Sequence, residues 1–197
     1  MTLAELNASV RDCQQCRLAS KRTQVVVGAG NPAATIMFIG EAPGFHEDKQ
    51  GEPFVGAAGK LLTELLDSAG LSRNDVYIAN VIKCRPPDNR NPLPDEIETC
   101  KPFLMQQIQL INPKVICTLG NFAIRTMLGK QVSITKIRGE HFEVQGFDVF
   151  PMLHPAAALH QGNFRVLLQE DFRKLKKYLD NTHLMQPKTA EQMGLFG

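Results

Sequence analysis

Residues 40–59 have the sequence G-E-A-P-G-F-H-E-D-K-Q-G-E-P-F-V-G-A-A-G. An apolar run at 35–39 precedes them and a run with helical spacing at 60–66 follows, so the pattern predicts a strand, a long loop and a helix. Five glycines and two prolines in this loop indicate a backbone that closely approaches a ligand. Glu41 lies where the strand ends, which is the ligand-binding edge of an open α/β sheet. The loop is therefore the first candidate for the active site, and the alternative is a flexible surface loop with solvated acidic side chains.

The 197 residues are 43% hydrophobic, which is enough to bury the core of one domain. We expect that domain to span residues 1–180, with a flexible C-terminal tail at 181–197. No run of 18 apolar residues occurs, and the amino terminus lacks the basic-then-apolar order of a signal peptide. These features predict a soluble, cytoplasmic protein with no membrane partner. Because the net charge is only +2, any nucleic-acid partner must be bound by a local basic face.

Five cysteines in such a chain argue against a disulfide framework and favour a metal site or a catalytic thiol. Four of them lie at the ends of predicted elements, in the pattern C-x2-C-x67-C-x15-C, and could converge on one tetrahedral site. They are Cys13, Cys16, Cys84 and Cys100. Zinc and a [4Fe–4S] cluster both fit this pattern, and unrelated thiols are the alternative. Cys117 lies inside an apolar run that suits a core strand, so we leave it out of the site.

Strand-like and helix-like segments alternate along the chain, which predicts an α/β domain with a parallel sheet covered by helices. A hairpin at the edge of the sheet is expected over residues 139–147, where apolar residues alternate with polar ones. The predicted strands are 35–39, 76–83, 115–119 and 149–153. The predicted helices are 3–12, 61–69, 96–111, 121–128 and 164–179.

Three polar residues stand at the carboxyl ends of three predicted strands, namely Glu41, Asn80 and His154. Because these ends converge on one crevice in an open α/β sheet, a carboxylate, an amide and an imidazole would share a pocket. Phe54 of the long loop is available to stack on a ligand there.

This set of groups suits one kind of chemistry. An amide offers a donor and an acceptor side by side, as needed to recognise a pyrimidine edge, and an aromatic ring supplies a flat stacking face. An imidazole can donate to a carbonyl oxygen that gains charge, and a carboxylate can position water or offset a developing cation. Together these groups could cleave an N-glycosidic bond. The structural alternatives are an asparagine satisfied by nearby backbone and a histidine without a catalytic role.

Four motifs, together with the four cysteines, resemble family 4 uracil-DNA glycosylases over about residues 13–179. The motifs are Gly40-Glu-Ala-Pro-Gly44, Gly51-Glu-Pro-Phe-Val-Gly56, Asn80-Val-Ile-Lys-Cys-Arg-Pro-Pro87 and His154-Pro-Ala156. The resemblance implies a single domain whose central four-stranded parallel sheet is flanked by helices on both faces. It also implies a structural [4Fe–4S] cluster with Cys13, Cys16, Cys84 and Cys100 as its ligands.

The resemblance further implies a role for each residue of the constellation. Glu41 would position water or stabilise the sugar cation, and Phe54 would stack on uracil. Asn80 would bind the Watson–Crick edge, His154 would stabilise charge on O2, and backbone amides near Glu41 and Ala42 would help to hold the base. The implied enzyme is monofunctional, flips deoxyuridine out of the stack, and excises uracil by hydrolysis without a lysine Schiff base.

Two features depart from relatives of this family. One relative forms a covalent histidine adduct through a basic loop, but the corresponding residues 87–92 contain no histidine, so we predict turnover. The loop after the His-Pro motif is also spaced differently from that of better-known uracil glycosylases. Leu159, Arg85 or His160 are the candidates for contacting DNA as the wedge residue.

The tail contains a separate motif. Gln192-Met-Gly-Leu-Phe196 resembles the Gln-x-x-Leu-Phe peptides by which bacterial repair proteins bind the sliding clamp. Gln192 would be the anchor, and Leu195 and Phe196 would enter an apolar groove. We otherwise expect a monomer whose partner is uracil-containing DNA.

Three other functions remain open at this stage. A glycosylase of the same superfamily could act on another deaminated base, and a non-catalytic, metal-containing DNA-binding module could use the same cysteines. A nucleotide-binding protein is disfavoured because neither G-x-G-x-x-G nor G-x-x-x-x-G-K-[ST] occurs.

Overall fold

The computed structural model describes residues 1–182 and 184. The predicted clamp-binding residues Gln192, Leu195 and Phe196 lie outside the described residues. The strands are β1 (Ala29–Gly30), β2 (Ile36–Gly40), β3 (Val76–Asn80), β4 (Val115–Leu119), β5 (Phe142–Val144) and β6 (Phe147–Met152). The α-helices are α1 (Leu3–Arg11), α2 (Phe45–Gln50), α3 (Ala57–Ser68), α4 (Pro94–Ile111), α5 (Asn121–Leu128), α6 (Ile134–Ile137), α7 (Pro155–His160) and α8 (Gly162–Thr182). Two short 3₁₀ turns lie at Arg17–Ser20 and Pro87–Asn89.

The strands form one sheet in the order β1-β3-β2-β4-β6-β5. The four central strands are mutually parallel, and β1 and β5 pair antiparallel at the two edges. The expected four-stranded parallel sheet is thus not confirmed as such, because the sheet of the described residues has six strands and is only partly parallel. β1 has two residues, too few to produce an alternating pattern, and β5 belongs to the hairpin expected at 139–147.

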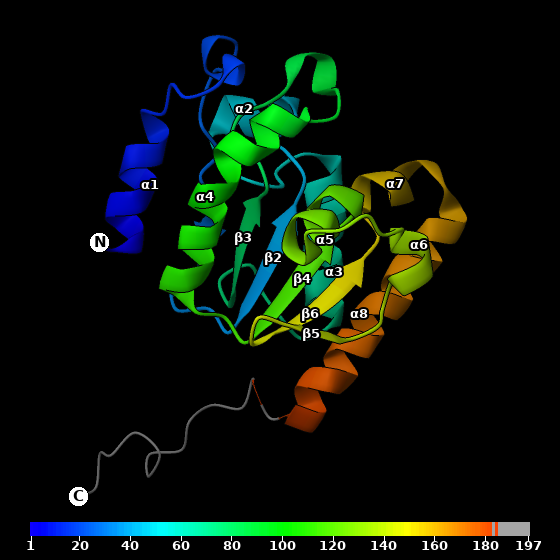
Figure 1. Cartoon of the computed structure of the whole chain (residues 1–197). Helices are drawn as coiled ribbons and strands as arrows, with labels where there is room; N and C mark the ends of the chain where they lie inside the picture. Colours follow the sequence, from blue (N-terminus) through cyan, green and yellow to red (C-terminus); the bar gives the residue numbers. More distant parts are fainter. Residues whose placement is uncertain (183, 185–197) are drawn as a thin grey trace, which may run out of the picture.

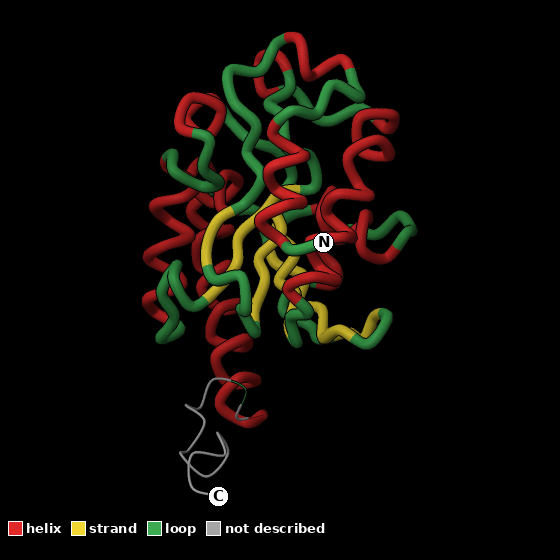
Figure 2. Tube along the Cα trace, turned by 90° about the vertical axis from the view of Figure 1, so that its left-hand side faces the viewer, coloured by secondary structure: helices red, strands yellow, loops and turns green. Residues whose placement is uncertain are grey.

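Helices cover both faces of the sheet. In Figure 1, α4 and α5 lie in front of the strands and α3 and α8 lie behind them, and the view turned by 90° shows helices on either side of the sheet (Figure 2). β2, β3 and β4 are buried along their whole length, which explains their almost continuous apolar sequences. Phe38 of β2 stacks on Phe172 of α8, with ring centroids 5.8 Å apart. Among the described residues, no helix is long and apolar enough to cross a membrane.

At the carboxyl ends of two neighbouring strands, β2 and β4, the chain leaves the sheet toward opposite faces (Figure 1). After β2 the chain passes through the short α2 into α3, which lies on the rear face, whereas the helix that follows β4 is α5, on the front face (Figure 1). An open α/β sheet forms its ligand crevice where successive connections leave in opposite directions. The loop that begins at Glu41 opens onto this crevice.

The segment 40–59 is more ordered than the expected long loop. It contains α2, and α3 already begins at Ala57. α2 is only six residues long, so it has too few turns to show a helical period in the sequence.

Candidate active site

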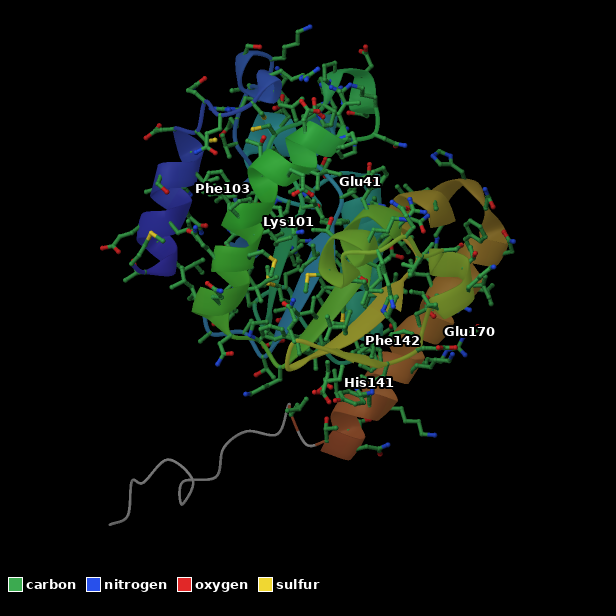
Figure 3. The ribbon with its side chains drawn as sticks, in the orientation of Figure 1. Glu41, Lys101, Phe103, His141, Phe142 and Glu170 are labelled. Carbon is green, nitrogen blue, oxygen red and sulfur yellow. The ribbon has the colours of Figure 1, made fainter. Side chains whose placement is uncertain are left out.

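A cavity of about 290 Å³ lies at the carboxyl ends of the parallel strands. Five residues expected to bind or act on the base line it together, although they are far apart in the sequence: Glu41, Ala42, Phe54, Asn80 and His154. Glu41 follows β2 at the upper end of the sheet in Figure 3. The other lining residues are Pro43, Gly44, Glu47, Ala58, Pro86, Asn89, Arg90 and Ala156.

The floor of the cavity depends on Gly40, the last residue of β2. A Cβ atom added there would lie 2.4 Å from Oδ1 of Asn80 and 2.6 Å from Cζ of Phe54. Both distances are shorter than real Cβ contacts. Glycine therefore lets the amide and the aromatic ring approach the same point of the backbone.

The amide of Asn80 is poised for a ligand. The residue is 1% exposed at the end of β3, and its Oδ1 atom has no hydrogen-bond partner among the described residues. A buried acceptor without a partner costs free energy, which a ligand N–H group can recover.

The imidazole of His154 is neutral and has a defined tautomer. Its Nδ1 atom accepts a hydrogen bond from the backbone N–H of Ala156, at 3.1 Å, so the proton of the neutral ring is on Nε2. Burial lowers the pKa of His154 to about 4, and the nearby Glu47 carboxylate opposes this shift only weakly. His154 is consequently a hydrogen-bond donor through Nε2 at neutral pH.

The carboxyl group of Glu41 is also perturbed by burial, which raises the pKa of Glu41 to about 6. The group is still largely ionised at neutral pH. It is a carboxylate in a poorly solvated site, where it interacts more strongly with a developing positive charge than it would in water.

The ring of Phe54 forms one wall of the cavity and stacks on His154, with centroids 5.6 Å apart and an interplanar angle of 28°. Its backbone has a φ of 55°, which is unfavourable for a bulky residue. The guanidinium of Arg73 holds this conformation by donating to the carbonyl groups of Pro53, at 2.7 Å, and Phe54, at 3.2 Å. Gly59 of α3 lies so close that an added Cβ would be 1.8 Å from the Phe54 carbonyl oxygen.

Glu47 is a site residue that the sequence analysis missed. Its Oε1 atom accepts hydrogen bonds from the backbone N–H groups of Val55 and Gly56, both at 2.8 Å. Its Oε2 atom accepts from the N–H of Gly44, at 3.2 Å. Through Glu47, α2 is therefore hydrogen-bonded to the backbone before it, at Gly44, and to the backbone after it, at residues 55–56. Its position three residues after Gly44, as in a capping box, was the signal that could have indicated this role.

The four candidate metal ligands line a second, much smaller cavity of about 20 Å³. Cys13 and Cys16 come from the segment after α1, Cys84 from the segment after β3, and Cys100 from α4. Apolar side chains form most of the remaining wall, including Phe103, which is labelled on α4 in Figure 3.

The chemistry around these thiols suits ligands better than a catalytic nucleophile. Burial raises the pKa of Cys84 to about 11, although Nη1 of Arg22 donates to its sulfur at 3.5 Å. A nucleophilic cysteine needs a lowered pKa. No group of three or more His, Cys, Asp or Glu side chains in residues 1–182 and 184 has the spacing to hold a single metal ion. The four cysteines nevertheless line one mostly apolar cavity, as the donor set of a larger cluster would require. Cys117 is buried within β4 and does not line this cavity, as predicted.

A profile of the uracil DNA glycosylase superfamily matches residues 27–180. The chain belongs to this superfamily. The match covers all six strands and all but the last two residues of α8, so it includes the residues that line the 290 Å³ cavity and two of the four clustered cysteines, Cys84 and Cys100.

Within the superfamily, the chain is similar to type-4 uracil-DNA glycosylases. The protein of Saccharolobus solfataricus is 50% identical over 181 residues, which are 87% of this chain and 84% of that protein. The protein of Thermotoga maritima is 49% identical over 174 residues, covering 86% of this chain and 91% of that protein. The protein of Sulfurisphaera tokodaii is 48% identical over 185 residues, covering 89% and 84%. The chain is thus a member of the type-4 group.

The three predicted DNA contacts of this glycosylase do not line the 290 Å³ cavity. Leu159 and His160 are exposed at the end of α7, and the side chain of Leu159 is 42% exposed. Arg85 is half-buried, donates from Nε to Oδ1 of Asn89 at 2.7 Å, and lies over the ring of the exposed Phe45. Of these, Arg85 is connected to the cavity, because Asn89 is one of its lining residues.

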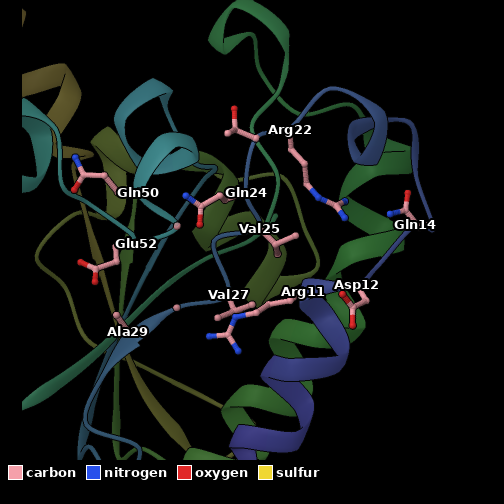
Figure 4. A pocket seen from close by; sticks show the side chains of 13 residues that line it. Arg11, Asp12, Gln14, Arg22, Gln24, Val25, Val27, Ala29, Gln50 and Glu52 are labelled. Carbon is pink, nitrogen blue, oxygen red and sulfur yellow. The ribbon is translucent and has the colours of Figure 1, made fainter.

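A larger cavity, of about 810 Å³, lies elsewhere in the glycosylase, between the end of α1 and residues 22–29 (Figure 4). None of the predicted site residues lines it. Its wall mixes the cations Arg11 and Arg22 with the acids Asp12 and Glu52, so it has no single charge preference.

Proposed function

We propose that this chain flips deoxyuridine out of DNA and hydrolyses its N-glycosidic bond with the residues of the 290 Å³ cavity. The chain is a uracil-DNA glycosylase that acts in DNA repair. The observation that carries the proposed mechanism is the buried Oδ1 of Asn80, which shares the cavity with Phe54 and His154 and has no hydrogen-bond partner in the described part of the chain.

Asn80 supplies the specificity. Its Oδ1 atom accepts the N3–H of uracil and its amide nitrogen donates to O4, while the ring of Phe54 stacks on the base. Cytosine offers the opposite donor and acceptor order at these positions, so it would leave buried polar groups unpaired. The backbone around Ala42 holds the opposite edge of the base.

His154 and Glu41 supply the catalysis. The Nε2–H of His154 donates to O2 of uracil, where negative charge develops as the base departs. The carboxylate of Glu41 positions the attacking water and stabilises the cationic sugar. Both interactions strengthen as the bond breaks, which is the condition for accelerating the reaction. Residues 87–92 contain no histidine that could trap the sugar, so we propose turnover without a covalent adduct.

Cys13, Cys16, Cys84 and Cys100 are proposed to hold a [4Fe–4S] cluster with a structural role. Its presence would join the segment after α1 to the segment after β3 and to α4. A brown colour and iron that co-purifies with the protein would support the cluster, and colourless protein containing zinc would contradict it.

Arg85, Leu159 and His160 are proposed to contact the DNA around the flipped nucleotide. Leu159 is an exposed apolar side chain of α7, the helix that contributes Ala156 to the cavity, and suits a wedge between bases. The cytoplasmic location and the monomeric state stay predictions.

The sliding clamp is a further proposed partner, through Gln192, Leu195 and Phe196. Deletion of residues 190–197 should abolish binding to the clamp without changing the rate of uracil excision from short oligonucleotides. Binding can be measured by surface plasmon resonance with the full chain as reference. Equal affinity of the two proteins would rule out this motif.

The decisive test of the function is excision from a panel of oligonucleotides that contain uracil, hypoxanthine, xanthine or cytosine at one position. Alkali-labile abasic sites should form only, or much faster, at uracil. Faster release of hypoxanthine or xanthine would instead support the alternative substrate.

Activity should also fall in acid, because Glu41 acts as a carboxylate. The pKa of Glu41 is about 6, so kcat/KM should decrease about tenfold per pH unit below that value. His154 would not cause this decrease in kcat/KM, because its pKa of about 4 keeps the imidazole neutral near pH 6. A decrease that begins only near the unperturbed glutamate pKa of about 4.3 would contradict the assignment. The residual activity of Glu41→Gln should not show the decrease below pH 6.

A further inference from the structure

Lys83 is a buried lysine to which neither the motifs nor the proposed mechanism gives a role. It lies between Asn80 and Cys84 in the sequence and is only 1% exposed. Lysine is almost never fully buried without a partner, because its ammonium loses its hydration. Among the described residues no carboxylate forms an ion pair with it.

Two hydrogen bonds connect the amine to separate parts of the fold. Nζ donates to the backbone carbonyl of Asn80, at 2.8 Å, and to Oε1 of Gln107 on α4, at 2.6 Å. Nε2 of Gln107 in turn donates to Oδ1 of Asn7 on α1 and to the carbonyl of Val27, both at 2.8 Å. The amine thus joins the end of β3 to α4, which carries Cys100, and through Gln107 to α1, which precedes Cys13.

Lys83 also lines the small cavity that the four cysteines share. An ammonium group at this position would offset the negative charge of thiolate ligands. The same nitrogen holds the residue whose side chain faces the base. A leucine or methionine could fill the same volume, but neither could supply the charge or the two hydrogen bonds.

We propose that Lys83 is a positioning residue that couples the cysteine site to Asn80. The backbone of residues 80–82 is held on one side by β2 and its loop, because Val81 N–H donates to Gly40 and Ile82 N–H donates to Glu41. Lys83 holds it on the other side through the Asn80 carbonyl. Without that bond a buried carbonyl loses its partner, and the strand end shifts together with the amide that it carries. This inference rests on the proposed roles of Asn80 and of the four cysteines.

The test compares Lys83→Met with the wild type, both as purified iron-containing protein. Lys83→Met keeps the apolar stem and removes the ammonium. We expect KM for a short uracil-containing oligonucleotide to rise about tenfold, with kcat within about threefold, because the base-binding amide is displaced while Glu41 and His154 remain. We also expect iron loss to a chelator, followed by visible absorbance, to become about tenfold faster.

Tyr77→Phe is the matched control, because Tyr77 accepts a hydrogen bond from Asn7 at the far end of the same network but carries no charge. In Tyr77→Phe, KM and the rate of iron loss should both stay within about twofold of the wild-type values. Wild-type KM and iron release in Lys83→Met, with only a lower melting temperature, would overturn the proposal, because that result describes a purely structural lysine.

Two further variants keep the test decisive. If Lys83→Met does not fold, Gln107→Leu removes the acceptor on α4 and keeps the lysine, and it should shift both quantities in the same directions by about threefold. Wild-type values in Gln107→Leu would then overturn the proposal. Asn80→Ala separates this inference from the proposed function: a normal KM there refutes the role of Asn80 itself, whereas an impaired Asn80→Ala beside a normal Lys83→Met refutes only the coupling.

Discussion

Replacement of Glu41 by glutamine should reduce kcat at neutral pH by about 10²- to 10⁴-fold, the usual contribution of a positioned acid or base. Glutamine has the same shape and keeps the hydrogen-bonding oxygen, but it cannot stabilise the sugar cation with a charge. Single-turnover excision from a uracil oligonucleotide measures this step without interference from product release.

The melting temperature of Glu41→Gln distinguishes a loss of catalysis from misfolding. Burial raises the pKa of Glu41, so the carboxylate is less stable in the folded chain than in the unfolded chain at neutral pH. Glu41→Gln should therefore melt at the same temperature as the wild type or higher, as expected where a catalytic charge costs stability. Glu52→Gln is the matched control, because Glu52 is an exposed acid of the same segment and does not line the 290 Å³ cavity. An inactive Glu52→Gln, or an active Glu41→Gln, would contradict the assignment.

Replacement of His154 by asparagine should reduce kcat by about 10²- to 10³-fold, the cost of removing one donor from a developing anion. His154 is the N-cap of α7, and its Nδ1 atom accepts from Ala156 N–H. Asparagine is also a favourable N-cap, so it preserves this bond, but it is too short to supply the donor that Nε2 provides.

His154→Ala is the informative comparison. It removes both the cap and the donor, so it should lose the same catalytic factor and in addition about 1 kcal/mol of stability. If His154→Asn retained full activity while His154→Ala lost it, the histidine would serve only to begin α7. The two variants thus measure the catalytic and structural contributions of one side chain separately.

The convergence of Glu41, Asn80 and His154 on one cavity could be predicted from the sequence because it depends on a general property of parallel sheets. Glu41, Asn80 and His154 each lie where an apolar strand ends, and these ends meet at one edge. Strand and helix positions were accessible for a similar reason, since long buried runs and helical periods are local signals. The two-residue β1 and the six-residue α2 were missed because neither is long enough to show a period.

The contacts that hold Phe54 and Asn80 in place could not be predicted, because they are made by charged residues that are distant in the sequence. Arg73 donates to the carbonyl of Pro53, which lies 20 residues earlier, and Lys83 donates to Gln107, which lies 24 residues later. In the sequence both look like ordinary solvated cations. Only the folded chain shows that one holds the loop of Phe54 and the other occupies the core.

The conformation of Phe54 has a consequence for how the enzyme meets its substrate. A left-handed backbone at a bulky residue costs about 1–3 kcal/mol, and here Arg73 and Gly59 impose it from within the protein. The folding free energy compensates for this strain, so the strained conformation is already present before DNA binds. In the proposed mechanism, the flipped base enters a preformed pocket, so the protein loses little conformational entropy when it binds the base.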